Sequence, residues 1–414
     1  MAAVTIHDQP VIALDNGAGS IKIGYAGSTF PHAVIPTVVG RPLIRSSALK
    51  QAATVAGRPT AAASPSPQTD LKELMIGDET TALRHLLDIS SPIANGVIRN
   101  EADMALLWNY AFSEKLRQDP STCWISTSEP PGMGDPQRAR LFEMLFEQYR
   151  VPAIQTNLQG TLILYSIGET TGLAVDCGES CCQVQPIYEG IGLTRGISRL
   201  HLGGHQVTEK LIRLMQIRGY DFNKSADFEV ARAIKEMFCY SAVDPALEKR
   251  LALDTAVLEK PFTLPDGQSC VIGAERYLAP EVLFNPSLMN VECEGLSTQV
   301  WDSINNCPMD VRTSLYGNIV LAGGSSMFPG LPSRLERDLK AYYLDRAVKG
   351  DKARLARFKL RIVDAPRRKH MVYQGSATYA AITASSPEEH FMTRAQWAEE
   401  GANGVTARFA QRGN

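Results

Sequence analysis

The sequence has no long apolar run, almost no net charge and few aromatic residues. None of its 414 residues falls in an unbroken apolar stretch of about 18, so no membrane-spanning helix is expected. The start, MAAVTIHDQP, lacks the basic and apolar segments of a secretory signal. Its 42 Lys and Arg nearly balance 44 Asp and Glu, which excludes a general basic field for nucleic acid or anionic lipid. We therefore expect a cytosolic chain that recognises its partners locally.

Paired cysteine spacings are also missing. The chain has 8 cysteines, none arranged as a C-x-x-C pair, and it is too large to need disulfides for stability. Free, buried thiols are predicted. One cluster, Cys177, Cys181 and Cys182, offers soft metal ligands, but no second Cys or His pair follows at finger-like spacing. A zinc site is therefore not favoured.

The length and the apolar content predict two lobes. A chain of 414 residues exceeds the size at which one hydrophobic core usually stops growing, and 44% apolar residues is ordinary globular composition. Residues 46–70 differ from the rest, because they consist largely of Ala, Ser, Thr, Pro and Gln and contain no aromatic residue. They are predicted to form a disordered surface insertion, and their composition does not indicate a function.

A strand–turn–strand pattern occurs twice. Apolar residues 11–14 lead into the turn Asp-Asn-Gly-Ala-Gly at 15–19, which alternating apolar residues follow. Residues 173–175 lead into Asp-Cys-Gly-Glu-Ser at 176–180, about 160 residues later, again followed by a strand pattern. The repeat predicts a duplicated lobe with one hairpin in each copy.

Helical patterns alternate with these strands. Helix starts are predicted at Asp135-Pro136, at Thr208, after Ser225 and at a capping box formed by Ser333 and Glu336. A hairpin is predicted over residues 262–272, turning through Pro-Asp-Gly at 265–267. Strands and helices mixed in this way indicate α/β lobes with central sheets.

The glycine-rich turns suit an anion. Glycine lets backbone N–H groups approach phosphate oxygens closely, and two such turns facing each other would hold a polyphosphate from both sides. Lys22 would add a positive charge, while Asp15 and Asp176 would order a magnesium ion through water. A third glycine-rich turn, residues 321–326, is suited to an adenosine. Neither a P-loop nor a dinucleotide-binding G-x-G-x-x-G occurs in the right setting, which argues against those nucleotide folds. Taken singly, each turn is more typical of an ordinary hairpin.

The chain resembles a known family along nearly its whole length. The segments LDNGAGSIKIGYAG, PHAVIPTVVGRP, DCGES with PIYEG, AIKEMFCY, FTLPDGQSCVIGAERY, VLAGGSSMFPGLPSRLERDL and APRRKHMV are similar to actin and its relatives. The resemblance implies the actin-like, duplicated ribonuclease H-like α/β fold, with ATP or ADP and Mg²⁺ or Ca²⁺ in a central cleft. It also implies four subdomains: 1–36, 93–166 and 370–414; 37–92; 167–202 and 293–369; and 203–292. Chain crossings between the lobes would lie near residues 159–166 and 368–369.

The same resemblance assigns roles to residues. Gln159 would orient the attacking water, with Asp176 as a weaker catalytic candidate, and Asp15 and Asp176 would hold the metal through water. The implied nucleotide-binding residues are Asp15, Asn16, Gly17, Ala18, Gly19, Lys22, Asp176, Gly178, Glu179, Ser180, Gly204, Lys235, Glu236, Gly323, Gly324, Ser325, Met327, Phe328 and Lys369.

Several of these positions depart from the family pattern. Ala18 stands where a Ser or Thr hydroxyl usually contacts the terminal phosphate, and Glu179-Ser180 replaces Asp-Gly in the second loop. Gln183 stands where a His commonly relays protons, and an amide does not titrate. His205 replaces an Arg that usually lines the base side of the cleft. These changes predict slow or impaired hydrolysis, so that the chain is at most a weak ATPase.

The resemblance extends to the branch of the family that works in a filament-nucleating complex. It implies a subunit that pairs with a second actin-related protein to mimic a filament end. Further implied partners are the other complex subunits, actin and nucleation-promoting factors, in the cytoplasm at the cell cortex. Two alternatives remain open. One is a divergent conventional actin or an autonomous actin-fold ATPase that forms its own filaments or phosphorylates a sugar, and the other is a subunit of a chromatin remodeller. Filament pelleting, sugar-dependent ADP release and the identity of co-purifying proteins distinguish them.

Overall fold

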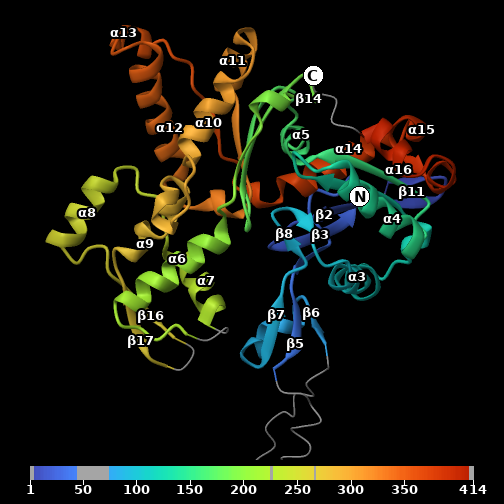
Figure 1. Ribbon diagram of the computed structural model, residues 1–414, viewed down its shortest axis with the longest axis horizontal. Helices are drawn as coiled ribbons and strands as arrows, with labels where there is room; N and C mark the ends of the chain where they lie inside the picture. The colour runs from blue at the N-terminus through green and yellow to red at the C-terminus, as the bar shows by residue number, and fades with distance from the viewer. Residues whose placement is uncertain (1–3, 44–73, 224–226, 265–266, 410–414) are drawn as a thin grey trace, which may run out of the picture.

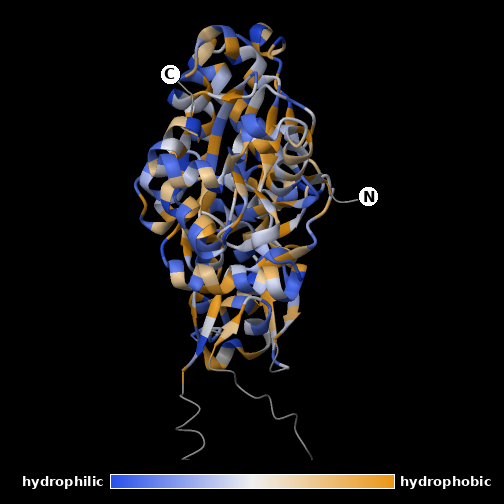
Figure 2. Ribbon diagram, turned by 90° about the vertical axis from the view of Figure 1, so that its right-hand side faces the viewer, coloured by the Kyte–Doolittle hydropathy of each residue, from blue (hydrophilic) through white to orange (hydrophobic). Residues whose placement is uncertain are grey.

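The computed structural model describes residues 4–43, 74–223, 227–264 and 267–409. Two lobes stand side by side in the broad view, and the molecule is much narrower when turned by 90° (Figures 1 and 2). The predicted insertion at residues 46–70 lies outside the described residues. Within the described part of the chain, no helix is long and apolar enough to span a membrane.

The first lobe is built on a seven-stranded sheet in the order β20-β11-β10-β2-β3-β4, with β1 paired to β2. Strands β2 and β3 form the first predicted hairpin, and β10 runs parallel to both β2 and β11. The strands are β1 (Thr5–Ile6), β2 (Gln9–Asn16), β3 (Ser20–Tyr25), β4 (Ala33–Pro36), β10 (Trp124–Glu129), β11 (Ala153–Leu158) and β20 (Met392–Thr393).

The second lobe repeats this arrangement in a six-stranded sheet. The hairpin of β12 and β13 is followed outward by β18, parallel to β12, and β19, parallel to β18. The order β13-β12-β18-β19 thus matches β3-β2-β10-β11, which confirms the predicted duplication. The strands are β12 (Gly172–Cys177), β13 (Cys182–Tyr188), β14 (Ile191–Gly192), β15 (Ser198–Leu200), β18 (Ile319–Ala322) and β19 (Ile362–Val363).

Helices cover both sheets. Those of the first lobe are α3 (Glu101–Asn109), α4 (Asp135–Glu143), α14 (Met371–Thr383), α15 (Pro387–His390) and α16 (Arg394–Phe409). Those of the second are α6 (Gly204–Ile217), α7 (Asp227–Phe238), α8 (Pro245–Asp254), α9 (Glu275–Leu278), α10 (Leu296–Asn305), α11 (Met309–Tyr316), α12 (Leu331–Tyr342) and α13 (Lys352–Leu355). Helix α5 (Gln159–Tyr165) carries the chain from the first sheet to the second.

Smaller pieces extend each lobe. Below the first lobe in Figure 1 lie β5 (Val39–Pro42), β6 (Met75–Ile76), α2 (Glu79–Leu83) and β7 (Leu87–Ser90), with the short hairpin β8 (Ile93–Ala94) and β9 (Val97–Ile98) above them. The second lobe carries the predicted hairpin as β16 (Lys260–Thr263) and β17 (Ser269–Ile272). Residues Pro265 and Asp266 of its turn lie outside the described residues.

Each lobe has its own buried core, as its size predicts. In the first lobe, Ile12 and Leu14 of β2 pack with Trp108 and Phe142. In the second, Val175 of β12 belongs to a larger cluster that includes residues of α6, α7, α10 and α12. A third cluster joins α5 and α14 to the second sheet, so the two lobes share a packed base.

Two predicted helix starts, at Thr208 and Ser333, are wrong, and the start predicted at Asp135-Pro136 is confirmed except that Asp135 is not the cap. Helix α6 begins four residues before Thr208, because Gln206 accepts a hydrogen bond from the Gly203 N–H and caps the helix there. Helix α4 is preceded by Gly134, so Asp135 is its first residue and not its cap. The Ser333–Glu336 pattern lies inside α12, which starts at Leu331 after a glycine and places a proline in its first turn. Ser225 lies outside the described residues. For α4, α6 and α12, the chain direction set by the preceding turn decides where the helix begins.

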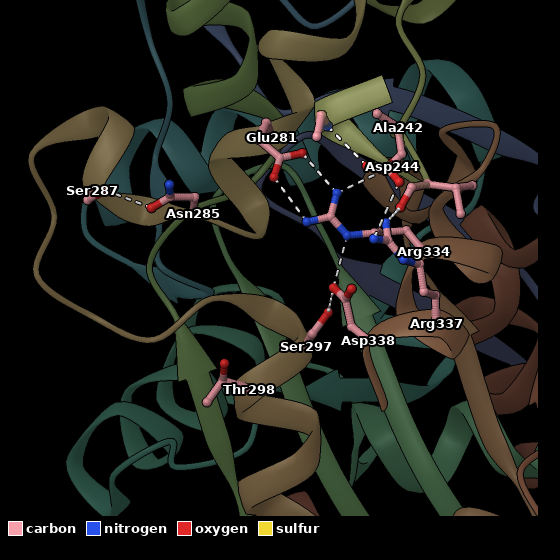
Figure 3. A network of polar contacts seen from close by, with 12 residues as sticks. Ala242, Asp244, Glu281, Asn285, Ser287, Ser297, Thr298, Arg334, Arg337 and Asp338 are labelled. Carbon is pink, nitrogen blue, oxygen red and sulfur yellow. Dashed lines mark hydrogen bonds and ion pairs between the residues drawn. The ribbon is translucent and has the colours of Figure 1, made fainter. Parts of the chain in front are cut away.

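A buried arginine fixes α12 behind the third glycine turn. Arg334 donates two hydrogen bonds to Glu281, at 3.1 and 3.2 Å, and a third to Asp338 at 2.9 Å (Figure 3). Ser297 of α10 donates to the same Asp338 carboxylate at 2.8 Å, and Arg334 also reaches the carbonyl of Ala242. The network holds α12 against α10, so the turn that leads into α12 has a rigid support.

The cysteines are free thiols, as predicted. Seven of the 8 are buried, and Cys293 is exposed. Among the described residues, no group of three or more His, Cys, Asp and Glu that could hold a metal ion occurs.

Candidate functional site

A cavity of about 580 Å³ lies between the two lobes. Every residue to which the sequence assigned a site role lines it, except Gly204 and His205. Gly204 lies directly behind the wall, where a Cβ would come within 2.6 Å of both Glu179 Oε2 and Ser325 Oγ. Further lining residues are Ser20, Val34, Pro36, Asp78, Gly96, Cys181, Gln183, Arg232, Cys239, Pro329, His370 and Val372.

The first two glycine turns meet face to face across this cavity. A Cβ built on Gly19 would lie 2.9 Å from the Cβ of Glu179, a distance that real Cβ atoms do not reach. A side chain at Gly17 would clash with the carbonyl of Ser20 at 2.6 Å. Glycine is therefore required where the hairpins from the two lobes approach each other, and their backbones form opposite walls of one cavity.

Two carboxylates lie at the ends of the strands that carry these turns. Asp15 accepts hydrogen bonds from Lys22 at 2.8 Å and from Ser128 at 2.9 Å. Asp176, next to the last residue of β12, is half-buried on the cavity wall, and desolvation, followed by the charge of Asp15, raises its pKa to about 6, while Lys22 opposes the shift. Two neighbouring carboxylates of this kind are suited to a cation.

The third glycine turn closes the cavity from the second lobe. Gly323 has φ +85°, and a Cβ there would lie 2.2 Å from the carbonyl oxygen of Cys177. Ser325 donates to the Gly178 carbonyl at 2.7 Å and so joins the second turn to the third. Met327 and Phe328 follow on the cavity wall. The third turn thus packs against the second, an arrangement that only glycine at 323 permits.

Helix α7 forms the cavity wall opposite the third glycine turn. Lys235 is buried, donates to the Gly204 carbonyl at 2.9 Å and lies 3.9 Å from Glu179. Burial lowers the pKa of Lys235. One turn earlier, Arg232 lines the cavity and holds Glu236 at 3.1 Å. Positive side chains therefore line the wall next to the apolar residues of the third turn.

Two glutamines lie at the inner end. Gln159 begins α5 and lines the cavity. Gln183 is 6% exposed and donates to the sulfur of Cys181 at 3.4 Å, while its Oε1 has no hydrogen-bond partner within the described part of the chain. A buried acceptor left open toward a cavity is suited to a water or a ligand.

Some residues that line the cavity were missed by the sequence interpretation, and one residue that it expected there lies outside the cavity. Arg232 lies three residues before Lys235 on α7, so helical periodicity would have found it. Asp78 and His370 carried no sequence signal, and burial, with Lys22 and Lys369 nearby, lowers the pKa of His370 to about 4. His205, expected on the base side, does not line the cavity; it is exposed and lies 3.5 Å from Glu209.

Two contacts span the lobes at the cavity. Arg84, next to β7, pairs with Glu229 of α7 at 2.7 Å. Arg199 of β15 donates to the carbonyl of Asn95 in the β8–β9 hairpin. These contacts join the two lobes.

The combined arrangement suits a polyanion with an attached aromatic group. The backbone turns and Lys22 lie at one end of the cavity, where the carboxylates of Asp15 and Asp176 suit a cation. Residues 327–329 and α7 form the other end, which is both apolar and positively charged.

Comparison with known proteins agrees with this geometry. The model of the family described as Actin matches residues 6–410. Actin-related protein 2 of Acanthamoeba castellanii is 43% identical over 391 residues, which cover 94% of this chain and 96% of the relative. Proteins of the same name from Drosophila melanogaster and Caenorhabditis briggsae are 42% and 41% identical, each over 94% of this chain and 95% of the relative.

A family model that covers most of the chain, relatives of this similarity and a duplicated two-lobed α/β fold around one cavity lead to the same conclusion: this chain belongs to the actin family.

Proposed function

We propose that this chain is an ATP-binding, actin-related subunit of a complex that nucleates branched actin filaments. The observation that carries ATP binding is the meeting of Gly19 and Glu179 from opposite lobes at one cavity. ATP would lie with its phosphates between the two hairpin turns and its base against Met327, Phe328 and α7. Asp15 and Asp176 would hold the divalent cation through water, and that cation would neutralise phosphate charge.

The donor set fits such a ligand. Lys22 supplies a positive charge, glycine backbones supply N–H groups, and Gln183 has an open acceptor suited to a water. We retain the four subdomains inferred from the sequence as part of this proposal.

Hydrolysis is proposed to be slow. Ala18 offers no hydroxyl to the terminal phosphate, and removing one hydrogen bond to a charged group costs roughly 1.5 to 3 kcal/mol. Glu179 points toward Lys235 at 3.9 Å, and Gln183 cannot take up a proton. Gln159 remains to orient a water. A single-turnover assay on the assembled complex tests this, and hydrolysis as fast as in conventional actin would refute it.

The role in a complex rests on likeness to relatives named actin-related protein 2. Affinity purification followed by identification of the co-purifying proteins is expected to recover a second actin-related protein and further subunits. Recovery of a helicase subunit would indicate a chromatin remodeller, and self-pelleting with ATP and magnesium would indicate an autonomous filament former.

Replacing Lys22 by methionine is expected to weaken ATP binding about 10- to 100-fold. The change removes the positive charge next to the first turn and leaves Asp15 without its partner at 2.8 Å. Equilibrium binding of a fluorescent ATP analogue measures the effect. The exposed Lys249, changed in the same way, serves as the control, and equal affinities of the two variants would contradict the placement of the phosphates.

Replacing Arg84 by methionine is expected to speed ATP release about 2- to 5-fold. The variant loses the 2.7 Å pair with Glu229 between the lobes, and partly exposed pairs contribute up to about 1 kcal/mol. Methionine keeps apolar contact with Phe228, over whose ring the guanidinium lies. Stopped-flow displacement of the same analogue reports the rate. An unchanged rate would show that this pair does not restrain the lobes.

A further inference from the structure

Cys181 differs from the other cysteines in both its position and its contacts. It follows the second glycine turn directly and lines the cavity with Gly178, Glu179 and Ser180. Of the eight thiols, only Cys181 and Cys239 line that cavity. Cys181 is thus buried with respect to the molecular surface but borders the space in which a ligand would lie.

Three donors converge on its sulfur. The Gln183 amide donates to Sγ at 3.4 Å, the Arg199 guanidinium at 3.6 Å and the Ser180 hydroxyl at 3.8 Å. Reactive cysteines lie in such electropositive surroundings, next to an arginine or a lysine, with a path for the reagent. Cys239 offers a contrast in the same cavity, because burial raises its thiol pKa to about 12, so it holds little thiolate at neutral pH.

A second observation points to an occupant beside this sulfur. Gln183 is 6% exposed, lines the cavity and keeps its Oε1 without a partner in the described part of the chain. Arg199 of β15 is the strand partner of Gln183, and its buried Nε–H also has no hydrogen-bond partner in the described part of the chain. One buried acceptor and one buried donor therefore lack hydrogen-bond partners on the two residues that contact this thiol, which suits a small polar molecule carrying a carbonyl group.

We propose that Cys181 is a covalent modification site for small α,β-unsaturated carbonyl compounds, and that bound ATP closes the site. In this reaction the sulfur adds to the β-carbon. An S–C bond forms, the C=C π bond breaks, and the thiol proton ends on the α-carbon, so no oxidant or reductant is needed. The adduct would occupy the phosphate end of the cavity.

The adduct would also act on the lobes. Arg199 contacts both the Cys181 sulfur and the Asn95 carbonyl of the opposite lobe. A group added to the sulfur competes with the guanidinium for the same space and so loosens this link. Modification would therefore exclude ATP and weaken this contact between the lobes. This inference rests on the proposed ATP binding only for the protection that ATP gives.

The test uses the full chain, N-ethylmaleimide as the probe and mass spectrometry to follow each cysteine. Without nucleotide, Cys181 is expected to react at least about tenfold faster than Cys239, because that thiol is largely protonated. Saturating ATP with magnesium is expected to slow Cys181 at least about tenfold and to leave the exposed Cys293 unchanged. The modified protein is expected to lose ATP affinity, whereas a Cys181→Ser variant given the same treatment keeps the affinity it had before treatment.

The outcomes separate the two proposals. If ATP binds by equilibrium dialysis but does not slow Cys181, the inference is overturned. The same holds if Cys181 reacts no faster than Cys239 in the nucleotide-free protein. If ATP does not bind at all while Cys181 reacts rapidly, the proposed function fails and the modification site stands.

Discussion

Replacing Asp176 by asparagine is expected to raise the free energy of unfolding of the nucleotide-free protein by about 2 to 3 kcal/mol at pH 7.5. The carboxyl is half-buried, and desolvation together with the charge of Asp15 raises its pKa from 3.8 to about 6. A shift of one pKa unit corresponds to about 1.4 kcal/mol, so the charged form destabilises the folded state by roughly this amount. Asparagine is of similar size and carries no charge.

The sign of the pH dependence follows from the same shift. Between pH 4 and 6 the folded chain holds a proton that the unfolded chain has released, so this group's destabilising effect grows as pH rises through that window. The advantage of Asp176→Asn should therefore shrink to roughly 1.5 kcal/mol at pH 5. Denaturant unfolding at the two pH values measures it, with the exposed Asp345→Asn as control.

Magnesium and ATP should reverse the order of stability of the parent chain and the Asp176→Asn variant. A cation held near Asp176 favours the carboxylate, so ATP with magnesium is expected to stabilise the parent chain more than the Asp176→Asn variant. A variant that is less stable than the parent without nucleotide would show that the carboxylate is not strained by burial. A variant stabilised equally by ATP and magnesium would show that Asp176 does not serve the cation.

Replacing Arg138 by methionine is expected to lower the free energy of unfolding by about 3 to 5 kcal/mol. Arg138 and Glu129 are 1% and 2% exposed, and the guanidinium donates to both carboxylate oxygens, at 2.8 and 3.0 Å. Burial raises the pKa of Glu129, and the arginine opposes that rise. Without Arg138 a buried carboxylate is left without its charged partner, which is the costly case for a buried ion pair.

A matched control lies on the same helix. Arg140 of α4 pairs with Glu101 at 2.5 Å, but the two side chains are 69% and 41% exposed. Arg140→Met is expected to cost much less than Arg138→Met, because water and salt screen exposed pairs. A double variant, Arg138→Met with Glu129→Gln, should recover part of the loss. Equal costs for Arg138→Met and Arg140→Met would contradict the role of burial.

The repeat of strand, glycine turn and strand was readable from the sequence because it depends on local chemistry. Alternating apolar residues and glycines at 17, 19 and 178 determine hairpins wherever they occur. The helix starts were less accessible. Thr208 and Ser333 have the residue types of caps, yet the preceding glycines set the chain direction and place both residues inside helices. Local preference is weak beside the packing of a whole helix.

The features of the site also divide into those that the sequence determines locally and those that depend on tertiary packing. The sequence by itself determined which turns carry glycine and which strands end in aspartate, since these depend on backbone conformation within a few residues. Only the tertiary structure brought Gly19 against Glu179, added Arg232 and Asp78 to the wall and left His205 outside. Those features depend on how two lobes distant in sequence pack on a shared base, and neither lobe's sequence encodes the other's position.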